Sequence, residues 1–196
     1  MYSQKILNQV VEETGLKYQQ NSKGLLFLYR NQHAFEEGIK HTLLLKEAGQ
    51  RLETVNKERV LEIIPEIKNS KDQISGGIFS PDDESGDSRI FCEKLMETCR
   101  GMGGSFMQGV VIERIEASGK FIKRVVTNKG VYTAESYVLC LGSWSPLLVR
   151  SSLGIRLPIY PVKGYSITVP VENHHTPPRI GGLHEEDFLG FAPMGD

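Results

Sequence analysis

The sequence predicts a mixed α/β fold, and three features of the 196-residue chain indicate it. In the first third of the chain, apolar residues at helical spacing alternate with short apolar and aromatic runs. Three runs rich in β-branched and aromatic residues follow between residues 106 and 133, separated by turn-forming triplets. The continuous apolar run over 137–142 is typical of a strand buried on both faces, as in a parallel sheet.

The first part of the chain is predicted to be mainly helical. The apolar spacing indicates a helix over 4–14, a strand over 24–29 and a second helix that ends near Gly49. Asn56 is the expected N-cap of a third helix, and Pro65 is its expected end. The second helix should bury apolar residues at four-residue intervals, namely Phe35, Ile39 and Leu43.

Turn-forming residues over 82–87 mark the passage to a second structural unit. Asp87 or Ser88 then caps a helix that ends in the glycine cluster 101–104. This cluster follows a helix and precedes a strand, which is the reverse of the context in which glycine loops bind phosphate, so we interpret it as a helix end. The helix should bury the stripe Phe91, Leu95, Cys99 and Met102.

The second half of the chain is predicted to consist mostly of strands. After the buried strand at 137–141, which Gly142 ends, a helical turn near 146–149 and a polar loop over 172–187 are expected. The further strands are predicted over 106–115, 121–127, 131–133, 157–170 and 188–192, the first three of them as a meander.

Composition and charge exclude several classes of protein. The formal net charge is -1, which leaves no basic field for nucleic acid or anionic lipid. No apolar run approaches the roughly 18 residues of a membrane span, and the first residues lack a signal-peptide core, so we expect a cytoplasmic protein without a transmembrane segment. The three cysteines, Cys92, Cys99 and Cys140, lie in apolar patterns and are expected to be reduced and buried.

The histidines do not indicate a metal site. His174 and His175 are adjacent in a predicted loop, and His184 lacks a second histidine four residues away, although Glu185 and Asp187 follow closely. We therefore predict a solvated loop and no metal. No Gly-x-Ser-x-Gly elbow supports hydrolase chemistry.

Three local patterns carry more weight together than separately: 83–87 running into a helix, 141–145 after a buried strand, and 161–166. A buried strand that ends in Gly142 and Ser143 allows a ligand to approach the backbone closely at the carboxyl end of the strand. The alternative is a plain turn from strand to helix in which Trp144 is packed.

In their order and intervals, these patterns resemble the D-amino-acid oxidase-like family of FAD-dependent oxidoreductases, and within it the bacterial D-amino acid dehydrogenases. The resemblance covers most of the chain. It implies an antiparallel-sheet substrate domain combined with the middle piece of a Rossmann-like FAD domain. On that template, 1–80 and 158–196 are substrate-domain parts, and 81–157 belongs to the FAD domain.

The resemblance also suggests individual cofactor contacts. The backbone of Ile112, or of its neighbour Val111, resembles the position that meets adenine. Gly142 and Ser143, followed by Trp144, resemble positions near the phosphate and ribityl side of the flavin. The segment containing Gly164 resembles a return into the substrate domain near the isoalloxazine. Tyr165 is the one candidate catalytic residue, and a packed tyrosine in a half-buried strand is its alternative interpretation.

The family also has features that this sequence does not contain, namely an opening GxGxxG loop that holds the pyrophosphate and a later arginine for the substrate carboxylate. We therefore expect a fragment whose parent takes D-amino acids to 2-oxo acids and ammonia, at the inner membrane face where the family's electron acceptor is met. We expect this chain by itself to be inactive, to lose FAD and to self-associate. The alternative is a non-catalytic substrate-domain fragment or scaffold subunit without bound FAD.

Overall fold

The computed structural model describes residues 2–172 and 176–195, and the chain divides into two compact units. The first unit comprises Met1–Gly104 and Pro170–Asp196, and the second comprises Ser105–Val169. These bounds differ from the predicted changes of domain after residues 80 and 157. The helix after residue 87 belongs to the first unit because Asp87 donates its backbone N–H to Tyr18 O at 2.9 Å, and the Phe91 ring meets the Tyr18 ring edge-on.

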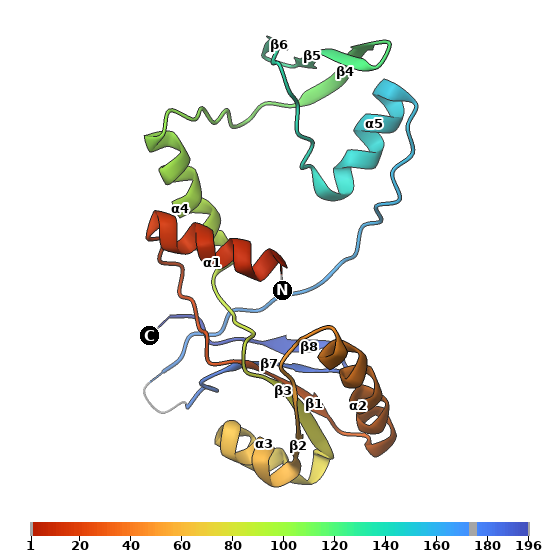
Figure 1. Ribbon diagram of the computed structural model, residues 1–196. Helices are drawn as coiled ribbons and strands as arrows, with labels where there is room; N and C mark the ends of the chain where they lie inside the picture. Colours follow the sequence, from red (N-terminus) through yellow and green to blue (C-terminus); the bar gives the residue numbers. More distant parts are fainter. Residues whose placement is uncertain (1, 173–175, 196) are drawn as a thin grey trace. The chain divides into compact units, whose positions relative to one another are not determined.

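The first unit contains a five-stranded sheet in the order β2-β3-β1-β7-β8 (Figure 1). The central strand β1 pairs antiparallel with β3 and parallel with β7, and the outer pairs are antiparallel. A strand therefore forms inside the region predicted as a loop, because the apolar Leu183 and two small glycines let residues 181–184 join β1. The strands are β1 (Leu25–Tyr29), β2 (Glu53–Asn56), β3 (Gly76–Ser80), β7 (Gly181–His184) and β8 (Leu189–Phe191).

Two helical layers cover this sheet, and the period-two alternation of β1 assigns a core to each. Leu26 and Leu28 pack with Val60 and Ile64 in one core, whereas Tyr29 packs with Phe35 in the other. The described helices of the first unit are α1 (Tyr2–Thr14), α2 (Gln32–Glu47), α3 (Lys57–Ile63), the 3-10 helix η1 (Pro65–Gln73) and α4 (Ser88–Gly101).

The helix caps are as predicted, but two of the predicted buried stripes are partly wrong. Asn56 accepts a hydrogen bond from Arg59 N, and Asp87 accepts from the amides of the first turn of α4. On α2, Thr42 is buried in place of Leu43, which is 57% exposed. Thr42 lies seven residues after Phe35, which is nearly two full helical turns, so both residues lie on the same side of the helix. On α4 no residue is fully buried: Phe91, Leu95 and Cys99 are half-buried, and Met102 lies beyond the last turn as the C-cap and is exposed.

The second unit contains the predicted meander, a three-stranded antiparallel sheet in the order β4-β5-β6. The helix α5 (Ser145–Leu153) packs on β4, where Ile115 N donates to Ser152 Oγ at 3.0 Å. A short 3-10 helix, η2 (Gly142–Trp144), leads into α5. The strands are β4 (Ile112–Ser118), β5 (Phe121–Thr127) and β6 (Gly130–Tyr132).

Three expectations for the second half of the chain are wrong. Residues 106–111, 137–142 and 157–170 form no strand, and Val138 and Val162 are almost fully exposed. An apolar run becomes a buried strand only when neighbouring strands supply a hydrogen-bond ladder on both sides, and no strand in the described part of the chain lies beside 137–142.

The expected burial of the cysteines is also not found. Cys92 and Cys140 are exposed, and Cys99 is half-buried. Cys140 lies in the run 137–142 that forms no strand, and Cys92 lies on α4, none of whose residues is fully buried.

Candidate functional site

The residues predicted to contact a cofactor all lie in the second unit. Ile112 begins β4, and the three consecutive residues from Gly142 to Trp144 form η2. Gly164 lies in the segment 154–169, which forms neither helix nor strand. Ile112 and the η2 residues thus belong to secondary-structure elements of the second unit, whereas Gly164 does not.

Ile112 lies on an edge strand, and its backbone is directed away from the sheet. Ile112 is opposite Thr127 on β5. In the neighbouring pair, Val111 and Asn128, Asn128 N donates a hydrogen bond to Val111 O at 3.1 Å. Since hydrogen-bonded and non-hydrogen-bonded pairs alternate in an antiparallel ladder, the N–H and C=O of Ile112 point to the open side of β4. A planar heterocycle with one donor and one acceptor can pair with such groups.

Val111, the neighbouring choice, does not offer the same groups. Its N–H donates to Asn128 Oδ1 at 2.9 Å, and its C=O accepts from Asn128 N. Both backbone groups are therefore satisfied within the protein, which favours Ile112 over Val111 as the position with a free edge.

An apolar hollow of about 210 Å³ lies beside Ile112 in the second unit. The residues over 137–139 line it, so the run that leads towards Gly142 and the start of β4 border the same space. The hollow therefore adjoins Ile112 and the run 137–139, three residues before η2 begins. The remaining lining residues come from the two longer strands and α5: Ile115, Ile122, Val125, Leu148, Val149 and Leu153.

Gly142 provides an open backbone position before the helix α5. Its φ is +52°, which favours glycine, and a Cβ added there would meet no heavy atom within 4 Å. The N-cap of α5 is Trp144, whose side chain makes no capping hydrogen bond. The backbone here is accessible to a ligand, and the N-terminus of a helix favours a negatively charged one.

Trp144 and Tyr165 are both exposed. Trp144 is 71% exposed, which contradicts the alternative of a packed tryptophan in a plain turn. Tyr165 is 87% exposed, and its described neighbour is Lys163, whose Nζ lies 5.1 Å from the centre of the ring. Tyr165 is therefore not the packed tyrosine of a half-buried strand, because residues 157–170 form no strand.

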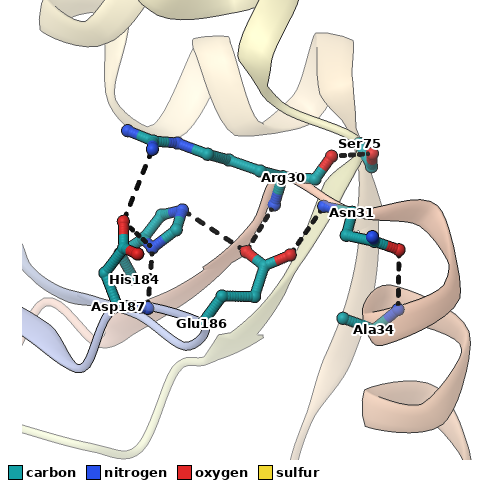
Figure 2. Close-up of polar contacts among 7 residues, drawn as sticks. All are labelled: Arg30, Asn31, Ala34, Ser75, His184, Glu186 and Asp187. Atoms are coloured by element: carbon teal, nitrogen blue, oxygen red, sulfur yellow. Dashed lines mark hydrogen bonds and ion pairs between the residues drawn. The ribbon is translucent and has the colours of Figure 1, made fainter.

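A polar cluster in the first unit was not anticipated from the sequence. His184, predicted to lie in a solvated loop, ends β7 and is 9% exposed. Its Nε2 lies 3.4 Å from Glu186 Oε2, and its Nδ1 lies 3.2 Å from Asp187 Oδ2 (Figure 2). The one signal in the sequence was the acidic run after His184. The cluster could not be derived from it, because the pairing of β7 with β1 is a tertiary contact.

Glu186 links this cluster to the start of α2. Its carboxylate accepts hydrogen bonds from Arg30 N at 2.9 Å and from Asn31 N at 2.7 Å, and Asn31 is the N-cap of α2. The neighbouring Tyr29 is affected as well. Its burial raises the pKa of the phenol to about 12, and the negative charges of Glu185 and Glu186 act in the same direction.

The acidic cluster is not a metal centre in this structure. Across residues 2–172 and 176–195, no group of three or more His, Cys, Asp or Glu side chains is placed to hold a metal ion. His174 and His175 lie outside the described residues. No helix in the described part of the chain is long and apolar enough to cross a membrane.

A family profile and individual relatives both match this chain. The sequence profile of the family described as FAD dependent oxidoreductase matches residues 1–192. The chain is 40% identical to a D-amino acid dehydrogenase of Chromohalobacter salexigens, over 100% of the chain and 46% of that protein. It is 34% identical to D-amino acid dehydrogenase 2 of Mesorhizobium japonicum, over 100% of the chain and 47% of that protein. The chain thus spans under half the length of these curated relatives.

Solved structures confirm the mixed α/β fold. The glycine oxidase of Geobacillus kaustophilus aligns with a TM-score of 0.70 at 19% identity, over 80% of this chain and 42% of that one. The L-proline dehydrogenase from P. horikoshii aligns with a TM-score of 0.68 at 19% identity, over 79% of this chain and 40% of that one. At this level of identity, the likeness concerns the fold alone.

Proposed function

Because the chain belongs to the family of FAD-dependent oxidoreductases, we propose that it forms part of a D-amino acid dehydrogenase, with the second unit on the cofactor side and the first unit on the substrate side. The names of its 34–40% identical relatives support the substrate class. The observation that carries the cofactor side is the pair of open backbone positions at Ile112, which lines the apolar hollow, and at Gly142, which precedes the helix α5.

The open positions of the second unit suit two parts of FAD, its adenine ring and a phosphate group. The apolar hollow and the outward N–H and C=O of Ile112 suit an adenine ring, which needs one donor, one acceptor and an apolar face. The backbone at Gly142 and Ser143, with the N-terminus of α5 behind it, suits a phosphate. Gly142 is required there because a side chain would occupy the approach and strain the backbone.

When FAD is bound, it supplies the electron chemistry by accepting a hydride from the α-carbon of the amino acid. The protein residues bind the substrate carboxylate and orient the C–H bond. The imino acid that leaves reacts with water to give a 2-oxo acid and ammonia. Tyr165 lies in the second unit and stays the one candidate catalytic residue, since its ring is 87% exposed and accessible to a ligand.

A chimaera tests this function directly. The chain replaces the segment that it matches in the Chromohalobacter salexigens protein, which supplies the rest of the sequence. We expect the purified chimaera to be yellow and its visible flavin band to bleach with D-amino acids under anaerobic conditions, but not with their L-enantiomers.

The control is the same chimaera with Gly142→Val, which should fold but lose flavin occupancy. A folded chimaera that carries no flavin, or whose flavin is indifferent to a panel of D-amino acids, would contradict the proposal. The chain by itself is expected to lose FAD on desalting, because the proposed contacts are few and open to solvent.

A further inference from the structure

His184 is the most enclosed histidine among the described residues, and its imidazole has contacts on both nitrogens. Its side chain is 11% exposed, and it shares a face of the sheet with Leu28, the residue opposite it on β1. Nδ1 accepts a hydrogen bond from Asp187 N at 3.3 Å. Nε2 is buried without a hydrogen bond, 3.4 Å from Glu186 Oε2. The ring is thus held between a backbone amide and two carboxylates (Figure 2).

The amide contact fixes the neutral form of the ring. A nitrogen that accepts from Asp187 N cannot carry a proton, so neutral His184 has its proton on Nε2, facing Glu186. In this form the turn after β7 is tied to the ring through a neutral hydrogen bond. Asp187 Oδ2 is then left to its ion pair with Arg30 Nη1 at 3.4 Å.

Protonation of Nδ1 makes that amide contact unfavourable, since two N–H groups would face each other. The same nitrogen lies 3.2 Å from Asp187 Oδ2, and a small rotation exchanges the amide for this carboxylate. The resulting imidazolium has an acidic partner on each side, at Glu186 and Asp187. The two protonation states therefore use different hydrogen bonds on the same residue of the turn.

We propose that His184 is a pH-operated latch between the turn over 185–188 and the junction of β1 with α2. In the protonated state the ring releases Asp187 N and gains both carboxylates. The change reaches α2 because Glu186 accepts from Arg30 N and Asn31 N, at the N-cap of that helix. The turn is also constrained at Phe188, whose φ of +51° is unusual for an aromatic residue.

The charged groups around the ring come from the turn after β7 and from the end of β1. The turn contributes Glu185, Glu186 and Asp187, and Arg30, the residue after β1, contributes the guanidinium that pairs with Asp187. On the face that carries Leu28, α3 and η1 form ion pairs among themselves, Lys57 with Asp72 and Arg59 with Glu62. The other charged residues of α3 and η1 are Glu58, Glu66, Lys68 and Lys71. The acidic groups of the turn thus outnumber the one guanidinium beside it.

The test is hydrogen exchange and imidazole NMR on the labelled 196-residue chain. From about pH 8 to about pH 5.5, where imidazole takes up a proton, protection of the Asp187 amide should fall about fivefold after correction for intrinsic rates, the loss of one ordinary hydrogen bond. Protection of the Arg30 and Asn31 amides should rise over the same range.

The matched variants are His184→Gln, which cannot take up a proton, and His41→Gln, which removes an exposed histidine of α2. The pH response at Asp187 should vanish in the first and persist in the second. An unchanged response in His184→Gln, or no response in the wild-type chain, would overturn the latch. If His184→Gln does not fold, imidazole NMR of the wild-type chain tests the proposal instead. A neutral His184 that carries its proton on Nδ1 and not on Nε2 would refute it. Neither result depends on whether FAD binds.

Discussion

Gly24, just before the central strand β1, is fixed both by its backbone and by its surroundings. Its φ is +93°, and an added Cβ would lie 2.8 Å from Ser80 O and 2.6 Å from the Phe79 ring. The carbonyl belongs to β3 and cannot move without disturbing the ladder with β1. We therefore expect Gly24→Ala to lower the free energy of unfolding by about 1–3 kcal/mol, measured by urea denaturation.

The control is Gly101→Ala, at the end of α4, where an added Cβ meets nothing within 4 Å and φ is not positive. Alanine should be neutral or slightly stabilising there. Equal midpoints for the two variants would show that the close approach at Gly24 is not a constraint.

Tyr29 makes the first unit sensitive to alkaline pH. Its pKa is raised to about 12 by burial and by Glu185 and Glu186, above the ordinary value of 10.0. A raised pKa means that the folded state holds the proton more tightly, so this contribution to stability is complete below about pH 10 and is lost as the pH rises towards 12. We expect the unfolding free energy to fall across that window.

In Tyr29→Phe, which keeps the ring against Phe35, that part of the alkaline loss should disappear. Phenolate absorbance and urea denaturation at matched pH values measure both effects. A stability curve with the same alkaline slope in the two proteins would contradict the assignment.

Single residues whose role is local were predictable, and those whose role is set by tertiary pairing were not. Asn56 and Asp87 were identified as caps because capping depends on the next three residues only. His184 was assigned to a loop because its burial depends on β1, about 155 residues earlier in the chain. The same limit explains why the acidic cluster around it was missed.

At the scale of elements, the short helix α3 depends on its cap. Seven residues are too few to form a stable helix alone, yet α3 carries Val60, which is fully buried in the core of the first unit. Asn56 supplies the capping bond to Arg59 N at 2.9 Å. Asn56→Ala should lower the unfolding free energy by about 0.5–2 kcal/mol, as measured by thermal or urea denaturation.

Asn56→Asp is the matched control, since it keeps a capping oxygen and places a negative charge at the helix N-terminus. It should be at least as stable as the wild type. A loss of stability as large as that of the alanine variant would show that the side-chain cap is unimportant.

The elements that were predicted correctly are those whose pattern is self-contained. The meander of β4, β5 and β6 follows from β-rich runs joined by short turns, and Gly119 adopts the positive φ that such a turn requires. The run 137–142 has the composition of a buried parallel strand, but composition does not provide the neighbouring strands. The cofactor contacts predicted at Ile112 and Gly142 stay a proposal.

At the scale of the whole molecule, exposed apolar side chains in the second unit predict self-association. Val138, Val162 and Ile167 are each at least 88% exposed, far above what an isolated soluble surface usually presents together. Sedimentation velocity should show oligomers whose share grows with concentration. Replacing Val138 and Val162 by lysine should shift the distribution to the monomer, and a wild-type chain that stays monomeric at every concentration would contradict this prediction.

The proposed cofactor side can be tested on the chain itself because Trp144 is its one tryptophan. It is 71% exposed and lies in η2, directly after the open backbone of Gly142. Fluorescence of Trp144 is therefore titrated with FAD, with free N-acetyltryptophanamide and the Gly142→Val variant as references. We expect saturable quenching of the wild-type chain that exceeds both references. Quenching that rises linearly and equals that of the free tryptophan derivative would contradict a FAD-contacting surface at η2.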